Sequence, residues 1–186
     1  MPVAAENSQP VAIVGGGLAG MALALALKLH GVGVEIFEAR ERASVRHDPR
    51  VLALSDGARQ ILDWLGVWSS LTATPIETIH ISQRGGFGRT VLRAAELDVT
   101  ALGWVLPAAD LIAALDAALS AAEVVYRENT KVGAGDTAHF KLTAFAEGVV
   151  DPAAGKMRDY GQHAVLCNVS VAAPHRNVAW ERFTDE

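Results

Sequence analysis

The sequence predicts an α/β fold, and three features of the first 40 residues support that prediction. Residues 11–14 form a short apolar run, typical of a strand that is buried on both faces of a parallel sheet. A glycine-rich turn follows at once, and residues 21–30 form an unbroken helix-forming stretch that ends at Gly31. Residues 32–37 are then predicted to form a second strand, which completes a strand–turn–helix–strand unit.

Composition and charge set the broad class of the protein. The chain has 186 residues, of which 51% are apolar and 20% charged, so it can bury a sizeable core in one domain or slightly more. The net charge of −5 and the scattered Lys and Arg side chains argue against a nucleic-acid-binding surface. Residues 11–27 are uncharged, but no basic residue precedes them and glycines interrupt them, so we expect neither a signal peptide nor a membrane span.

The turn itself satisfies G-x-G-x-x-G, and each glycine has a physical task there. Gly15 allows the tight turn out of the strand, Gly17 lets a pyrophosphate approach the backbone, and Gly20 lets helix and strand pack closely. Glu38 ends the second strand, 18 residues after Gly20, where its carboxylate can accept hydrogen bonds from ribose hydroxyls and repel a 2′-phosphate. We therefore predict a dinucleotide site for FAD or NAD rather than NADP. A turn that serves packing alone is the alternative.

The remaining elements follow from periodicity. A helix is predicted from Ser55 through Trp64, and a second one opens at Pro107 with an apolar stripe between residues 111 and 119. Residues 78–82 and 90–93 alternate as in an antiparallel hairpin. Further strands are predicted at residues 103–106, 123–126, 140–145, 163–171 and 177–183.

No other group of residues points to chemistry of its own. The six histidines lack metal-ligand spacing, so we expect no metal site, and the serines lack the setting of a hydrolase nucleophile. Cys167 is the single cysteine; it excludes an internal disulfide, fits a reducing compartment, and is predicted to be a buried apolar residue in a strand. Catalytic residues stay unknown, and a bound cofactor would have to supply the chemistry.

Longer stretches of the sequence carry a family resemblance. The chain resembles the single-component FAD-dependent aromatic hydroxylases (class A flavoprotein monooxygenases), in particular the branch that acts on polyprenylphenols in ubiquinone biosynthesis. The resemblance covers nearly the whole chain. It lies in residues 11–20, Glu38, 50–55, 65–68, 75–76, 79–82, 88–90, 102–105, 158–162 and 180–184.

The resemblance implies a fold and a set of cofactor-binding residues. We expect a doubly wound, Rossmann-like FAD-binding domain from residues 1–75 and 107–155. An antiparallel β-sheet substrate domain from residues 76–106 and 160–186 would be interleaved with it, and both domains would be incomplete. Sequence alone makes Arg50 a solvated loop residue, whereas the resemblance makes it an FAD ligand. The expected cofactor-binding residues are Gly15, Gly17, Leu18, Ala19, Gly20, Glu38, Arg40, Arg50, Val51, Val132 and Glu147.

The implied reaction uses FAD with NAD(P)H as co-substrate and transfers one oxygen atom from O₂ to a polyprenylated phenol or another aromatic substrate. We expect the protein to be cytoplasmic and to contact the surface of the inner membrane as a peripheral protein. A homo-oligomer and an assembly of ubiquinone-pathway enzymes both stay open. Two other functions remain: a different FAD- or NAD(P)-dependent oxidoreductase, and a non-catalytic nucleotide-binding subunit.

The chain departs from the family pattern in three places. Glu147-Gly148 stands where the family has Asp-Gly, and residues 129–145 are shorter than the family layout needs. The third fingerprint, Gly-Asp followed by Pro and Gly-Gln-Gly, is absent, and Gly135-Asp136 is a chance likeness to its opening. We therefore expect this chain to lack part of the flavin pocket and to be inactive alone or to assemble with copies of itself.

Overall fold

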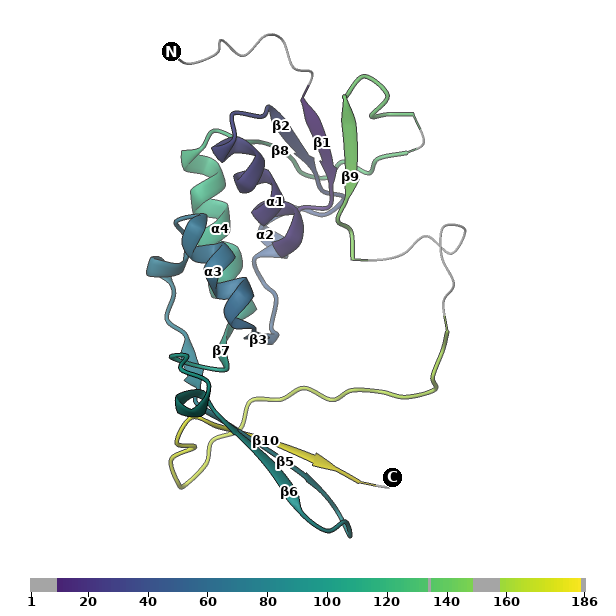
Figure 1. Ribbon diagram of the computed structural model, residues 1–186. Helices are drawn as coiled ribbons and strands as arrows, with labels where there is room; N and C mark the ends of the chain where they lie inside the picture. The colour runs from purple at the N-terminus through teal and green to yellow at the C-terminus, as the bar shows by residue number, and fades with distance from the viewer. Residues whose placement is uncertain (1–9, 134, 149–157, 185–186) are drawn as a thin grey trace.

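The computed structural model describes residues 10–133, 135–148 and 158–184 (Figure 1). Its central sheet has four parallel strands in the order β8-β2-β1-β9, formed by Val125–Arg127, Val34–Phe37, Val11–Val14 and Leu142–Phe145. Strand β1 is central, paired with β2 on one side and β9 on the other, and all four of its residues are buried. The predicted strand–turn–helix–strand unit is confirmed, and with it the α/β, Rossmann-like fold.

Two helices cover one face of this sheet. Helix α1 (Leu18–Leu29) begins three residues earlier than predicted, because the end of the glycine turn is already helical. It packs against α4 (Ala108–Ala121), whose buried side chains include the predicted Leu111, Leu115 and Leu119. On the other face, the ring of Phe140 meets that of Phe37 edge-on at 5.6 Å.

A second sheet is antiparallel, with strands β3 (Val51–Leu54), β7 (Gly103–Pro107) and β4 (Thr74–Ile76) in that order. Helix α3 (Asp56–Trp64) follows β3, and the Ser55 hydroxyl accepts a hydrogen bond from the Ala58 N–H at 3.2 Å, so the predicted N-cap is confirmed. Three short helical turns complete this part: α2 (Arg42–Val45), η1 (Trp68–Ser70) and η2 (Ala94–Glu96).

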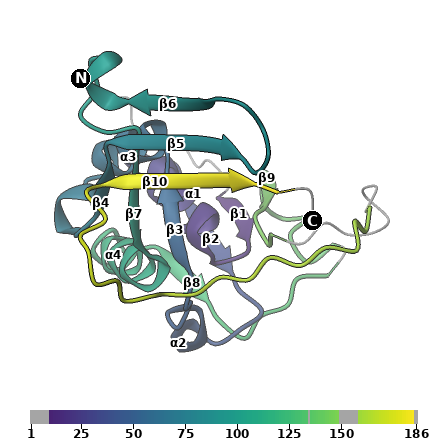
Figure 2. The ribbon, with the colours of Figure 1, turned by 90° about the horizontal axis from the view of Figure 1, so that it is seen from below.

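The third sheet contains the predicted hairpin of β5 (Thr78–Gln83) and β6 (Arg89–Arg93). Strand β10 (Val178–Phe183) lies on the other side of β5, so strands distant in sequence are neighbours (Figure 2). β10 runs parallel to β5, so this sheet is mixed and not wholly antiparallel as expected. The two-domain division with boundaries at residues 75, 107 and 155 stays a prediction.

The predicted strand at residues 163–171 is wrong. This stretch has no secondary structure, and Val165 and Leu166 are 87% and 73% exposed. Cys167 is also exposed, against the prediction of a buried residue. Among residues 10–133, 135–148 and 158–184, no strand lies beside this apolar run to pair with it. A strand needs a partner that satisfies its backbone groups.

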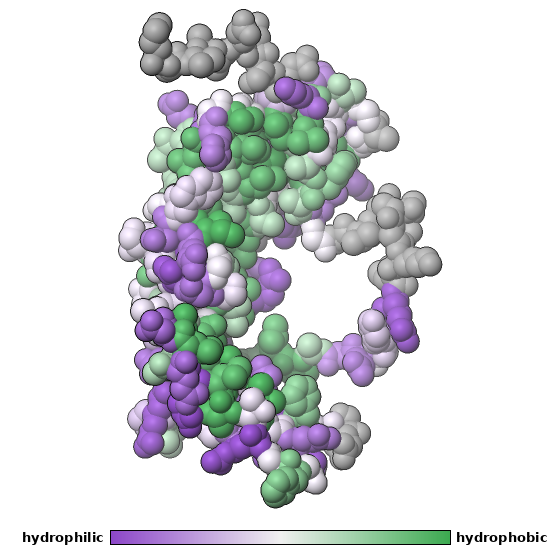
Figure 3. Space-filling view, in the orientation of Figure 1, coloured by the Kyte–Doolittle hydropathy of each residue, from purple (hydrophilic) through white to green (hydrophobic). Residues whose placement is uncertain are grey.

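Apolar side chains gather on the upper part of the surface in Figure 3, where the α-helices lie. Leu23 and Leu29 of α1 are exposed apolar residues. Within the described ranges, no helix is both long enough and apolar enough to cross a bilayer.

Candidate cofactor-binding site

The candidate site lies at the carboxyl edge of the parallel sheet. The glycine turn follows β1, Glu38 follows β2, and Ala146 and Glu147 follow β9. Backbone hydrogen bonds fix the turn, because the Gly15 N–H donates to the Phe37 carbonyl at 2.8 Å and the Ala146 N–H donates to the Val14 carbonyl at 2.7 Å. Ligands of open parallel sheets bind beyond this edge.

The three fingerprint glycines have different surroundings. Gly15 has φ +110°, and a Cβ there would lie 2.6 Å from the Ala146 carbonyl. A Cβ on Gly20 would lie 1.9 Å from the Gly15 oxygen, because α1 and the turn are in close contact. A Cβ on Gly17 would meet nothing within 4 Å. Packing therefore requires two of the glycines, whereas Gly17 borders open space at the start of α1.

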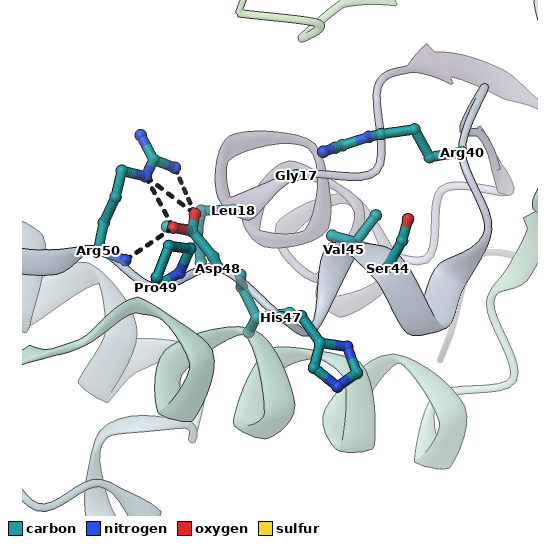
Figure 4. A pocket seen from close by; sticks show the side chains of 10 residues that line it. Gly17, Leu18, Arg40, Ser44, Val45, His47, Asp48, Pro49 and Arg50 are labelled. Carbon is teal, nitrogen blue, oxygen red and sulfur yellow. Dashed lines mark hydrogen bonds and ion pairs between the residues drawn. The ribbon is translucent and has the colours of Figure 1, made fainter.

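A cavity of about 470 Å³ opens beside Gly17 (Figure 4). The first turn of α1 contains no acidic residue, and no side chain caps its N-terminus. Its N–H groups and the positive end of the helix dipole are thus available to an anion. Arg40 and Arg50 stand on opposite sides of Gly17. The lining residues are Gly17, Leu18, Arg40, Ser44, Val45, His47, Asp48, Pro49, Arg50 and Ile112.

Glu38 is buried, with 5% exposure, and receives several hydrogen bonds. One carboxylate oxygen accepts from the Gly16 N–H at 2.8 Å; the other accepts from the backbone N–H of Arg40 at 3.0 Å and from Arg40 Nε at 2.9 Å. Burial raises the pKa of Glu38, but the hydrogen bonds from Arg40 and Gly16 outweigh it, so the net pKa is lowered. Glu38 is therefore a carboxylate at neutral pH.

Arg50 is paired with its own loop. Its Nε lies 2.9 Å and 3.0 Å from the two carboxylate oxygens of Asp48, and Nη2 lies 2.5 Å from one of them. The hydrogen bond from the Arg50 side chain lowers the pKa of Asp48. The Arg50 side chain is 58% exposed, so it keeps the freedom to reach a ligand in the cavity.

The structure brings together only some of the predicted cofactor-binding residues. Gly17, Leu18, Arg40 and Arg50 line one cavity. The others lie outside its lining: Glu38 contacts Arg40, Gly15 and Gly20 pack the turn, and Glu147 touches Gly15 through its backbone. Ala19 and Val51 are exposed, and Val132 is half-buried beyond β8. The role of each residue toward a cofactor stays a prediction.

Sequence reasoning missed the residues that hold the cavity wall. Asp116 is buried in α4, where the sequence signal was an acid within an Ala- and Leu-rich helix. Tyr126 in β8 donates its hydroxyl hydrogen to the Gly16 carbonyl at 3.2 Å. Burial and the nearby Glu38 carboxylate raise the pKa of Tyr126 to about 12. No periodicity in the sequence connects Tyr126 with the glycine turn.

Comparison with known proteins decides the family. Residues 8–156 match the family described as FAD binding domain. The chain belongs to this family. Relatives that match nearly the whole chain include the 3-demethoxyubiquinol 3-hydroxylase of Escherichia coli K12 (29% identical; 97% of this chain, 54% of the relative). Another is the ubiquinone hydroxylase UbiL of Rhodospirillum rubrum (32% identical; 96% of this chain, 48% of the relative).

The chain thus spans about half the length of these curated relatives. The alignment with the E. coli protein runs over 218 residues, more than the 186 of this chain, so the relative has segments that this chain lacks.

Solved structures share the fold. The 2-methyl-3-hydroxypyridine-5-carboxylic acid oxygenase superposes with a TM-score of 0.55 at 19% identity, covering 67% of this chain and 32% of its own. P. aeruginosa PqsL gives 0.58 at 19% identity, covering 69% of this chain and 35% of its own.

Proposed function

We propose that this chain binds FAD at the cavity beside Gly17 and forms the flavin-binding part of an aromatic hydroxylase that acts on a polyprenylphenol. The observation that carries the proposal is the open space over Gly17, at an uncapped helix N-terminus with an arginine on each side. A pyrophosphate needs these three features: close approach to backbone N–H groups, a positive helix end, and cationic side chains.

Glu38 supports an adenosine half without a 2′-phosphate. Its carboxylate lies at the end of β2, next to the glycine turn, and its lowered pKa keeps the negative charge that would repel a phosphate. Four donor contacts already occupy its oxygens, three of them from Arg40. A ribose hydroxyl would therefore replace the Arg40 side chain, which is 61% exposed and can turn toward the cavity.

FAD would supply the redox chemistry, reduced by NAD(P)H and reacting with O₂. The chain's own residues would bind and orient the cofactor. Arg50 would exchange part of its pairing with Asp48 for a phosphate oxygen, and Leu18 and Ile112 would exclude water from the cavity wall. The proposal that the substrate is a polyprenylphenol rests on the names of two relatives, of which this chain spans about half the length. We extend the proposal to NAD(P)H as co-substrate, and to contact with a membrane surface that carries the polyprenyl tail.

The test combines binding with turnover. The purified chain is incubated with FAD, NADH or NADPH, and a short-chain 2-prenylphenol, and the product is analysed by mass spectrometry. The proposal expects bound FAD, NAD(P)H oxidation stimulated by the phenol, and a product heavier by one oxygen atom. Bound FAD without phenol-stimulated turnover would assign the chain a non-catalytic role, and absence of FAD binding would refute the proposal.

A further inference from the structure

We propose that Asp116 is a positioning residue: its buried carboxylate holds α2 against α4 and thereby sets where Arg40 and Arg50 stand at the cavity. The inference rests on the proposed FAD site. It concerns a residue of α4 that lines no part of the cavity itself.

Asp116 pairs with two arginines at once. It is 2% exposed, and one of its carboxylate oxygens contacts Arg42 Nε while the other contacts Arg46 Nη2. Both arginines belong to α2 or directly follow it. A single buried carboxylate in α4 therefore pairs with two cations of the segment that leads from Arg40 to Arg50.

Arg42 has further anchors. Its backbone N–H donates to Glu128 Oε2 at 2.7 Å, its Nη2 donates to the Ser120 hydroxyl at 3.1 Å, and its guanidinium lies 4.6 Å from the centre of the Tyr126 ring. Helix α2 has only four residues, and no side chain caps its N-terminus. A helix of this length has no stability of its own, so these contacts hold it in place.

The same segment builds the cavity. Ser44, Val45 and His47 line one wall, and Ile112 of α4, one helical turn before Asp116, lines another. The Asp116 carboxylate thus joins the two walls. Asp116 pairs with Arg42 and Arg46, whereas Arg40 and Arg50 line the cavity.

Removing this carboxylate has a defined consequence. Asp116→Asn keeps the size of the side chain but removes the carboxylate charge that pairs with Arg42 and Arg46, whose side chains are 26% and 51% exposed. The arginines would turn to solvent, and α2 would leave α4. If these ion pairs served only global stability, their removal would weaken every property of the domain together.

The experiment compares Asp116→Asn, Asp116→Glu and the matched control Asp110→Asn, which removes the same charge from an exposed position on the same helix. FAD and ADP affinities are measured by titration at a temperature where each variant is folded. Tryptic cleavage after Arg42 and Arg46 is followed by mass spectrometry. ADP reports on the glycine turn, which Asp116 does not contact, whereas FAD also needs the segment 42–50.

We expect Asp116→Asn to weaken FAD binding about tenfold or more, to leave ADP affinity within about twofold, and to accelerate cleavage after Arg42 and Arg46. Asp116→Glu should recover most of the FAD affinity, and Asp110→Asn should match the wild type. FAD affinity unchanged in Asp116→Asn, or FAD and ADP weakened equally, would overturn the inference. If the wild-type chain binds no FAD, the proposed function fails, and unchanged tryptic cleavage would then refute the role of Asp116 separately.

Discussion

Gly16 occupies a variable position of the fingerprint, yet the structure predicts that this chain requires glycine there. A Cβ on Gly16 would lie 2.0 Å from the hydroxyl oxygen of Tyr126 and 2.6 Å from its Cζ. An ordinary contact starts near 3.4 Å, so in Gly16→Ala the Tyr126 ring must retreat by about 1.4 Å. That movement breaks the hydrogen bond from Tyr126 to the Gly16 carbonyl.

The cost follows from these two effects. The lost hydrogen bond contributes about 1 kcal/mol and the forced repacking about 1–3 kcal/mol, so Gly16→Ala should lower the free energy of unfolding by about 2–4 kcal/mol. For a chain of this size, the melting temperature should fall by about 5–15 °C. Thermal melts and urea titrations followed by circular dichroism measure both quantities.

Two further variants make the reasoning refutable. Gly17→Ala introduces a Cβ into open space and should change the free energy of unfolding by no more than about 0.5 kcal/mol. In a Tyr126→Ala background, Gly16→Ala should cost less than about 1 kcal/mol, since the ring is gone. A cost below 0.5 kcal/mol in the wild-type background, or an equal cost in both backgrounds, would show that Tyr126 is not the reason for Gly16.

Three other predictions address individual side chains. In Tyr160→Phe, Tyr126 is the only tyrosine, and absorbance titration after a rapid pH jump should give a Tyr126 pKa of about 12. Adding Glu38→Gln should lower this pKa, because a neighbouring negative charge is lost. A pKa that does not change with Glu38→Gln would contradict the role of the Glu38 carboxylate. The folded-state pKa of Glu38 lies below its unfolded value, so its contribution to stability is present at neutral pH and lost as pH falls through that lowered pKa. In urea titrations, the free energy of unfolding should fall less on acidification in Glu38→Gln than in the wild type. Parallel pH profiles of the free energy of unfolding in the two proteins would disprove this role of Glu38. Ser55→Ala removes the cap on the Ala58 N–H and should cost about 1 kcal/mol in the free energy of unfolding, whereas Ser55→Asn, another good cap, should cost little.

Local sequence signals predicted the part of the fold that local physics decides. The apolar run of β1, the glycine turn, the Ser55 cap and the stripe of α4 each depend on neighbours within a few residues in sequence. Strands β3 and β4 were not predicted, because they exist as partners of β7, about 50 and 30 residues further along the chain. Residues 163–171 show the converse, an apolar run with no partner strand in the part of the chain that the structure describes.

The residues of the candidate site also fall into those that the sequence predicted and those that only the structure reveals. The glycines and Glu38 follow from one contiguous unit of sequence, and their positions at the sheet edge agree with the spacing. Asp116 and Tyr126 act over 70 and 110 residues of sequence separation, and only the folded chain brings them to α2 and to Gly16. The glycine motif therefore located the cavity, but not the residues that hold its walls.

The most direct test of the central claim is a titration of the purified chain with FAD, followed by flavin fluorescence, for the wild type and for Gly17→Val. We expect saturable FAD binding by the wild type. Gly17→Val should lose that binding with an unchanged circular dichroism spectrum, because the added side chain would fill the space over the helix N-terminus. Equal FAD affinity in the two proteins would contradict a dinucleotide site at the glycine turn.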